Sequence, residues 1–311
     1  MKRILALAVG KPMNVTISNK TQLDGVRPYI EGLVDALASR GRPLGTDFVI
    51  DYSQSWYEDV VSGKAFKEKL NNHDLIYAMS TTVMRAAGKY TAEDIPIVFP
   101  NVSDPTQEKY VDLGRATGFS AKRTQTADKC FECFFATVPT LKEVIILHKD
   151  DHDISDHARE LVMSAAAKRG LTPTVVTIAS HQDLKDRLGK MLARDRGSPA
   201  SVGIQVLPVD LFFGATPDII KWVQKDKLLP AFFSVSDWVR PPYNALGGYG
   251  VPQYKCGEHT ALHVDRILWG SLIAKDLKVV DATDDDFEWV VSRAAADALN
   301  IPLGGISAHV I

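Results

Sequence analysis

The sequence predicts an α/β protein made of two successive parallel sheets with helices on their faces. Three observations support this fold class. Short apolar runs alternate with segments of helical periodicity, and this alternation requires crossover connections between parallel strands. The alternation begins again in the second half of the chain. The length of 311 residues also exceeds the size at which one hydrophobic core usually keeps growing, so two lobes are expected.

The first half begins with a strand at residues 4–9, because ILALAV is apolar without interruption. A helix is expected at 23–39, where apolar residues recur at helical spacing until RGRPLG ends the pattern. The other elements expected in this half are strands at 47–52, 74–80 and 95–102 and helices at 57–70 and from residue 80.

The segment GRATGFSA, residues 114–121, has glycines and small residues in place of apolar runs, so the boundary between the lobes is expected there. No internal repeat stands out. The second half is expected to contain strands at 143–148, 173–179, 201–207, 230–236 and 247–251 and helices at 127–136, 155–169, 181–194, 217–224 and 261–270.

Composition excludes several classes of protein. The net charge of −2 gives no general attraction to nucleic acid or anionic lipid. No apolar run approaches the length of about 18 residues that spans a membrane. Three cysteines are too few for a disulfide framework or a four-cysteine zinc site. Cys130 and Cys133 lie in an apolar helical segment, where buried thiols are the better interpretation than a redox pair.

Candidate binding residues follow the expected strands of the first half. Ligands of open parallel sheets usually bind at the carboxyl ends of the strands. Ser80, Thr81 and Thr82 lie where a strand gives way to a helix, so a hydroxyl can cap the helix and its free N–H groups can bind a carboxylate. Asn101 lies near the end of the strand IPIVFPNV, and Ser103 and Asp104 follow that strand directly. These groups can contact a ligand or form an Asx turn with the following proline.

The second half offers further candidates at its strand ends. Asp210 and Asp237 are placed to accept hydrogen bonds from a ligand ammonium group. Trp238 can supply one aromatic wall for a planar ligand, and Trp56 of the first half can supply another. Each tryptophan could instead simply pack in the hydrophobic core. Asp150, His152 and Asp153 follow the strand EVIILH. They can form a polar rim or, less simply, a metal cluster, but adjacent residues on one loop rarely all face one ion.

Several segments in this order resemble the ABC-transporter substrate-binding proteins of the tryptophan/tyrosine-binding type. The resemblance covers nearly the whole chain and rests on DIPIVFPNVSDP, ATGFS, LKEVIILHKDDHD, GGYGVPQYKCGEHTALHVDRILWG and AAADALNIPL.

The resemblance implies a type I periplasmic-binding fold, in which two Rossmann-like lobes are joined by a three-strand hinge and a solute is captured between them. It also implies a membrane permease and an ATPase as partners, and an exported protein, periplasmic or membrane-associated outside the cell. The printed sequence shows no leader, so the leader is expected to have been left out of it. Within the run MKRILALAVG, residues 4–9 are interpreted as the first strand and not as part of a secretory leader.

Two departures from the family pattern lie at the expected site. Residues 80–82 are Ser-Thr-Thr where many members have a threonine-proline pair, and residues 149–153 are KDDHD where they have an asparagine-proline-glycine turn. The solute of other members is therefore not transferred to this chain.

The lobes are expected to comprise residues 1–118 with about 246–272, and residues 119–245 with about 273–311. The expected function is a monomeric solute receptor without catalysis, cofactor or metal. Its expected solute is a small carboxylate, an amino acid or aromatic acid. The expected ligand-binding set is Asn14, Trp56, Ser80, Thr81, Thr82, Ser103, Asp104, Asp150, His152, Asp153, Asp210, Asp237 and Trp238.

Two alternatives stay open. A Rossmann-like nucleotide-dependent enzyme, for example an oxidoreductase, shares the alternating pattern. However, GKPMN follows the first strand in place of the G-x-G-x-x-G phosphate cradle. The sensor core of a transcription regulator shares the lobes, but neither the termini nor the net charge offers a DNA-binding segment.

Overall fold

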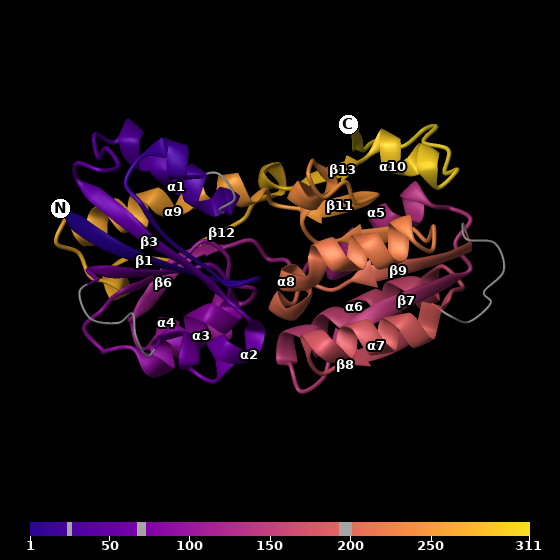
Figure 1. Ribbon diagram of the computed structural model, residues 1–311, viewed down its shortest axis with the longest axis horizontal. Helices are drawn as coiled ribbons and strands as arrows, with labels where there is room; N and C mark the ends of the chain where they lie inside the picture. Colours follow the sequence, from indigo (N-terminus) through magenta and orange to yellow (C-terminus); the bar gives the residue numbers. More distant parts are fainter. Residues whose placement is uncertain (24–26, 67–72, 193–200) are drawn as a thin grey trace. The chain divides into compact units, whose positions relative to one another are not determined.

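The computed structural model describes residues 1–23, 27–66, 73–192 and 201–311 (Figure 1). The chain divides into two compact units. Unit 1 comprises residues 1–122 and 253–283, and unit 2 comprises residues 123–252 and 284–311. The chain therefore passes between the units at 122–123, 252–253 and 283–284, whereas the sequence placed these crossings near 118, 245 and 272.

Unit 1 is built on a seven-stranded sheet in the order β12-β6-β5-β4-β1-β3-β2. All of its neighbouring strands are parallel except β2, which runs antiparallel to β3 at the edge. Its strands are β1 (Lys2–Val9), β2 (Met13–Ile17), β3 (Phe48–Ser55), β4 (Leu75–Ala78), β5 (Ile97–Phe99), β6 (Ala116–Ser120) and β12 (Val280–Asp281). Its helices are α1 (Pro28–Ser39), α2 (Tyr57–Val61), α3 (Thr81–Tyr90), α4 (Lys109–Asp112) and α9 (Gln253–Leu268), with short 3₁₀ turns that include η2 (Lys64–Phe66), η3 (Pro105–Gln107) and η7 (Ala274–Asp276).

Unit 2 repeats this plan with the strand order β14-β13-β11-β10-β9-β7-β8. Strand β13 is antiparallel to β11, and the other pairs are parallel. Its strands are β7 (Glu143–Lys149), β8 (Thr172–Ile178), β9 (Val202–Val206), β10 (Ala231–Phe233), β11 (Gly247–Gly250), β13 (Glu288–Val291) and β14 (His309–Val310). Its helical segments are α5 (Ala127–Thr137), α6 (Asp153–Lys168), α7 (His181–Leu192), α8 (Asp210–Ile219), η5 (Ile220–Lys225), η6 (Ser236–Val239) and α10 (Arg293–Ala298).

The α/β class with two lobes of mainly parallel strands that the sequence predicted is confirmed, and the two sheets share the order of five strands, β6-β5-β4-β1-β3 in unit 1 and β11-β10-β9-β7-β8 in unit 2. In unit 1 the chain runs from β1 outward to β3 and then returns to β4 on the other side of β1. In unit 2 it runs from β7 to β8 and returns to β9 on the other side of β7. Such a reversal of strand order is the place where open α/β sheets usually bind ligands, at the carboxyl ends of the strands.

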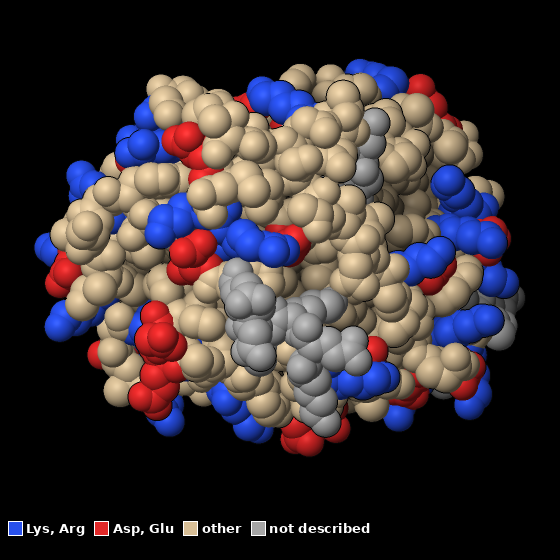
Figure 2. Space-filling view, turned by 60° about the vertical axis from the view of Figure 1, so that its left-hand side comes forward, with Lys and Arg blue, Asp and Glu red and all other residues tan. Residues whose placement is uncertain are grey.

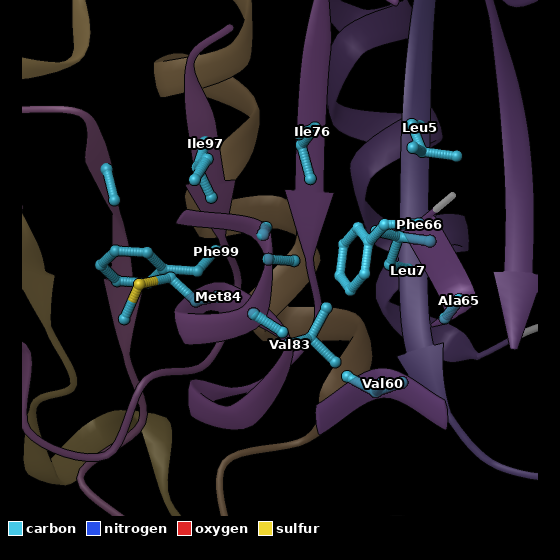
Figure 3. Packing of buried hydrophobic residues seen from close by; sticks show 14 of the residues in the cluster. Leu5, Leu7, Val60, Ala65, Phe66, Ile76, Val83, Met84, Ile97 and Phe99 are labelled. Carbon is cyan, nitrogen blue, oxygen red and sulfur yellow. The ribbon is translucent and has the colours of Figure 1, made fainter. Parts of the chain in front are cut away.

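The core of unit 1 shows why these segments form strands and helices. Leu5, Ile76 and Ile97 lie on adjacent parallel strands and belong to one buried cluster with Val83 and Met84 of α3 (Figure 3). All five side chains are almost fully buried, and burying each contributes roughly 1.5–3 kcal/mol. A sheet covered by helices in this way leaves mainly its strand ends for polar side chains.

The expected boundary at GRATGFSA is wrong in one respect, because residues 116–120 form β6 inside the sheet of unit 1. Gly118 lies in β6 with φ of +151°, and a Cβ atom there would lie 2.0 Å from the carbonyl oxygen of Phe99. The glycine therefore allows close approach of two strands and does not mark a linker.

Three further differences concern helices and edges. The helix expected at 57–70 is α2 followed by η2, and residues 67–70 lie outside the described part of the chain. The helix expected to begin at residue 217 begins at Asp210. The edge strands β2, β12 and β14, and β13 next to an edge, were not expected, because such short strands lack a long apolar run.

Charges of both signs are interspersed on the face shown in Figure 2, without a continuous basic stripe. Within the described residues, none of the helices has the length and apolarity needed to cross a membrane.

Candidate functional site

The turn between β4 and α3 presents the end of a helix at the carboxyl edge of the sheet in unit 1. Ser80 has extended backbone angles, φ −173° and ψ 169°, and its hydroxyl accepts a hydrogen bond of 3.2 Å from the N–H of Val83. Ser80 is therefore the N-cap that the sequence predicted. Helix geometry leaves the N–H groups of Thr81 and Thr82 without intrahelical acceptors, and these groups suit an anion.

The loop after β5 is attached to this turn. We call residues 101–104, Asn-Val-Ser-Asp, the unit 1 tip loop. The Thr81 hydroxyl accepts a hydrogen bond of 3.0 Å from the N–H of Ser103. Residues 80–82 and Ser103, predicted separately from the sequence, are thus brought together, and all of them are buried.

Asp104 has a local role in this loop. Its carboxylate accepts hydrogen bonds from the N–H of Thr106 at 3.2 Å, the Thr106 hydroxyl at 2.6 Å and the Gln107 side chain at 2.9 Å. It caps the 3₁₀ turn η3, which begins at Pro105. Of the two roles expected for Asp104, the structure contains the Asx turn.

Asn101, the first residue of the unit 1 tip loop, has an unsatisfied acceptor. It is 5% exposed, and its Oδ1 atom has no hydrogen-bond partner within the described residues. The printed pairing of β5 with β6 ends at Phe99 and Gly118, and beyond it the N–H of Val102 donates to the carbonyl oxygen of Phe119 at 3.4 Å. The next residue, Ser120, has a buried hydroxyl that also lacks a partner among the described residues. A buried acceptor without a donor costs free energy and calls for an explanation, such as a bound molecule.

Ser120 was not predicted as a site residue. It ends β6, a strand that the sequence analysis took for a boundary, so its position beside the end of β5 could not be foreseen. The one signal available in the sequence was that ATGFS, like IPIVFPNV, has a polar residue at or near its end.

The equivalent loop of unit 2 has a similar sequence. We call residues 234–237, Ser-Val-Ser-Asp, the unit 2 tip loop. Each tip loop follows a three-residue strand, β5 or β10, that occupies the same place in its sheet. The sequence analysis found no internal repeat, because a match of a few residues is recognised only when the two topologies are aligned.

The side chains of the unit 2 tip loop differ in exposure. Ser234 is buried, and its hydroxyl has no hydrogen-bond partner within the described part of the chain. Asp237 is half-buried. Trp238, expected as an aromatic wall, is 1% exposed and packs edge-on against Phe233 with ring centroids 5.4 Å apart.

A half-buried ion pair lies beside the unit 2 tip loop. Both terminal nitrogens of Arg240 donate to the carboxylate of Glu288, at 2.8 and 3.1 Å. Burial tends to raise the pKa of Glu288, but the hydrogen bonds from Arg240 and the charge of Arg240 outweigh it and hold that pKa below its usual range. Glu288 therefore stays ionised and anchors the segment that follows the tip loop.

The loop between β7 and α6 uses its polar residues mainly to begin the helix. His152 is the N-cap of α6, and its Nδ1 atom accepts a hydrogen bond of 3.3 Å from the N–H of Ser155. Asp153 is the first residue of the helix and, like Asp150, is exposed. Within the described residues, no three histidine, cysteine, aspartate or glutamate side chains are placed to hold a metal ion.

The other predicted residues lie at separate strand ends. Asp210 is buried and begins α8 after β9. Trp56 is half-buried and precedes α2 after β3. Asn14 is exposed on the edge strand β2, opposite Ser53 of β3.

The thiols of α5 are buried, as expected from their apolar surroundings. Cys130 donates to the carbonyl of Phe233 at 3.3 Å. Burial raises the pKa of Cys133 to about 12 and also raises that of Cys130. Both thiols are therefore protonated near neutral pH and unreactive as nucleophiles.

The sequence of this chain matches one known protein family. The family model for ABC transporter substrate binding proteins matches residues 14–304. No curated protein matches the chain in sequence.

Three solved structures are similar across almost the whole chain. A conserved domain protein from Vibrio cholerae has a TM-score of 0.76 and 21% identity, and the match covers 98% of this chain and 96% of that one. The ABC domain from Streptococcus pneumoniae in complex with L-Trp has a TM-score of 0.74 and 17% identity, with coverage of 100% and 99%. A ligand-free, open substrate binding protein with adhesive properties from Clostridium difficile has a TM-score of 0.59 and 20% identity, with coverage of 100% and 99%.

Proposed function

Because this chain belongs to the family of ABC transporter substrate binding proteins, we propose that it is the extracytoplasmic solute receptor of an ABC importer. Its solute is a small carboxylate, an amino acid or an aromatic acid. The receptor works as a monomer, delivers its solute to a membrane permease driven by an ATPase, and catalyses no reaction. It is periplasmic or associated with the outer face of a membrane.

The observation that carries this proposal is the buried oxygen of Asn101, unpartnered among the described residues, in a loop that is hydrogen-bonded through Ser103 to Thr81 at the start of α3. The free N–H groups of Thr81 and Thr82 suit a carboxylate. The Asn101 Oδ1 atom, which has no donor among the described residues, suits an ammonium group. A molecule that carries both groups on one carbon, an amino acid, matches this pair of requirements.

Under this proposal, side chains at the equivalent edge of unit 2 also bind the solute. The Ser234 hydroxyl, unpartnered among the described residues, can donate to or accept from the solute. Asp237 adds a half-buried carboxylate for the ammonium group. Asp150, His152, Asp153 and Asp210 stay candidates at neighbouring strand ends, and Asn14 is a candidate at the edge strand β2.

Tryptophan side chains near the proposed site suggest that the solute is aromatic. Trp56 is half-buried just after β3, at a place where its ring could stack on a flat solute. Trp238 offers little open surface, which leaves Trp56 as the better of the two walls. The Streptococcus pneumoniae structure contains L-Trp, which supports including aromatic amino acids among the solutes to be tested.

The proposed mechanism is closure of the two units around the solute. The chain crosses between them three times, at 122–123, 252–253 and 283–284, and these crossings would form the hinge. A solute that contacts both units favours the closed form in proportion to its differential affinity for that form. Release then requires a partner that favours the open form, the role we assign to the permease.

A thermal-shift screen of the purified chain tests the proposal. The panel contains the amino acids, aromatic acids lacking the amine, small carboxylates, and ATP and NAD as nucleotide controls. A solute held only by the native state adds about 2.7 kcal/mol of stability at 100 times its dissociation constant. We expect an amino acid to raise the melting temperature, whereas a shift with a nucleotide alone would favour the enzyme alternative.

The variant Asp237→Ala tests the assignment of the ammonium group. We expect it to weaken an amino acid about tenfold and the corresponding deaminated acid by less than a factor of two, because only the former presents a cation to the carboxylate. Isothermal titration measures both affinities. Equal losses for the two solutes would remove Asp237 from the proposed site.

A further inference from the structure

Unit 1 has a cavity of about 950 Å³ at the edge of its sheet opposite to the tip loop. Lys2, Asp74, Pro96 and Arg115 line it, and they lie at the amino ends of β1, β4, β5 and β6. In parallel strands the amino and carboxyl ends lie at opposite edges of a sheet. The cavity is therefore separate from the carboxyl edge, where Ser80 and Asn101 lie.

The walls of the cavity contain exposed aliphatic side chains. Leu113 is 66% exposed, Ile273 is 51% exposed and Leu272 is 36% exposed. Large apolar side chains gathered at one exposed depression commonly mark an interaction site. Ile267 and Leu268 at the end of α9 extend the apolar lining.

Cations outnumber acids around this apolar lining. Five cationic side chains and three carboxylates line the cavity, a formal excess of two positive charges in a chain of net charge −2. The cations are Lys2, Lys89, Lys109, Arg115 and Lys275, and the acids are Asp74, Glu93 and Asp94.

Among the described residues, three of these four lysines have no ion pair. Lys2 lies 3.4 Å from Asp74. In contrast, no carboxylate of the described residues lies within 4 Å of the ammonium groups of Lys89, Lys109 or Lys275, although Lys89 and Lys109 lie over neighbouring tyrosine rings. Their charges are therefore available to an anionic ligand.

The cavity walls are held in place by close packing. A Cβ atom on Gly88 would lie 2.4 Å from the ring of Tyr110, and one on Gly114 would lie 2.4 Å from the Cβ atom of Lys275. The guanidinium group of Arg115 donates to the carbonyl oxygens of Gly88 at 2.7 Å and Thr91 at 3.1 Å, at the end of α3. These contacts join α3, α4, β6 and η7 into one fixed wall.

We propose that this cavity, defined here as the amino-edge cavity, binds a small amphiphilic anion with an aliphatic chain and a terminal carboxylate. Its volume lies within the range of about 300–1,000 Å³ found for small-molecule pockets. The aliphatic chain lies along Leu113, Leu272 and Ile273. The carboxylate lies between Lys109 and Lys275.

Isothermal titration of the full chain with hexanoate, octanoate and uncharged octanamide tests this proposal. We expect one saturable site, with affinity rising about fourfold for each methylene added. We expect octanamide to bind about tenfold more weakly than octanoate, because it carries no charge for the lysines. Absence of saturable binding at millimolar octanoate, or equal affinities for octanoate and octanamide, would overturn the proposal.

Two sets of variants locate the binding. The double variant Lys109→Gln with Lys275→Gln is expected to weaken octanoate about tenfold and leave octanamide unchanged. Ile273→Ser should weaken both compounds about equally. Lys227→Gln, an exposed lysine of unit 2, is the matched control and should bind octanoate as the parent chain does. Octanoate binding that survives the double variant unchanged contradicts the proposal.

The solute receptor function can fail independently of this site. The double lysine variant should keep the melting-temperature shift produced by the solute of the thermal screen, since both lysines lie at the opposite edge of the sheet. Conversely, Ser80→Ala should weaken that solute and leave octanoate binding unchanged.

Discussion

The tip loops of units 1 and 2 share the sequence Val-Ser-Asp after equivalent strands, but different neighbours hold them. In unit 1 the Thr81 hydroxyl accepts the N–H of Ser103, and Asp104 binds three donors within its own turn. In unit 2 the loop continues into a segment anchored by Arg240 and Glu288. The two loops therefore share a sequence triplet, but different side chains hold the loop in place in each unit.

The residue that precedes the shared triplet differs in a way that bears on binding. Asn101 has a buried carbonyl oxygen without a partner among the described residues, and this oxygen can only accept. Ser234 has a buried hydroxyl, likewise unpartnered among the described residues, which can donate or accept. Under the proposed function, unit 1 binds the ammonium and carboxylate groups of the solute. The Ser234 hydroxyl of unit 2 then forms a hydrogen bond with another polar group of the solute, as either donor or acceptor.

The largest expected difference between the units concerns two glycines in helices. A Cβ atom on Gly257 of α9 would lie 2.2 Å from the carbonyl oxygen of Tyr29 in α1, whereas one on Gly189 of α7 would meet nothing within 4 Å. Gly257→Ala should lower the free energy of unfolding by about 3 kcal/mol through overpacking. Gly189→Ala should raise it by about 0.5–1 kcal/mol through helix propensity. Urea unfolding followed by circular dichroism measures both, and a Gly257→Ala chain as stable as the parent would contradict the close contact of α1 and α9.

A smaller effect is expected from the ion pair beside the unit 2 tip loop. Arg240→Met leaves the half-buried carboxylate of Glu288 without its partner, and we expect a loss of about 2 kcal/mol at pH 7. The matched control is Arg187→Met, whose exposed pair with Asp183 lies within one helix and should cost less than about 0.5 kcal/mol.

The pH dependence of this pair has a definite sign. Because the pKa of Glu288 is lowered in the folded chain, its contribution is fully present above the pKa of an unfolded glutamate and is lost as pH falls through the lower folded value. The stability difference between the parent and Arg240→Met should therefore shrink as pH falls from 7 to about 3. A difference that stays constant over this range would exclude ionised Glu288 as its source.

A third effect concerns the side chain that holds the unit 1 tip loop. Thr81→Val keeps the shape of the residue but leaves the buried N–H of Ser103 without its acceptor. We expect a loss of about 1–2 kcal/mol in unfolding free energy and a weaker solute response. Thr106→Val removes one of three donors to the exposed turn at Asp104 and should cost less, about 0.5 kcal/mol. Equal losses in denaturant unfolding would mean that the Thr81 contact adds nothing specific to the loop.

Much of the fold could be predicted because buried parallel strands have a strong sequence pattern. The apolar run of β1 and the change from strand to helix at Ser80 needed only local information. Strand β6 was missed because Gly118 looks like a linker residue until its contact with Phe99 is known. The helix expected from residue 217 was misplaced because Pro217, a usual first-turn residue, lies inside α8.

The candidate site was less predictable, since it depends on which strand ends meet. Residues 80–82 and Ser103 could be proposed from their positions after strands, but the hydrogen bond between Thr81 and Ser103 required the order of β4 and β5. Ser120 became a candidate only once residues 116–120 were known to form β6 and its hydroxyl to be buried without a partner among the described residues. Sequence alone also could not reveal that Trp238 packs against Phe233 with almost no exposed surface.

The most direct test of the proposed function, in which one solute contacts the tip loops of both units, is isothermal titration of a double-mutant cycle. Asn101→Ala and Ser234→Ala are measured singly and together with the solute that gives the largest thermal shift. We predict that each single variant lowers the affinity about tenfold while the unliganded chain stays as stable as the parent. An affinity that depends on only one of the two residues, or on neither, would contradict the account.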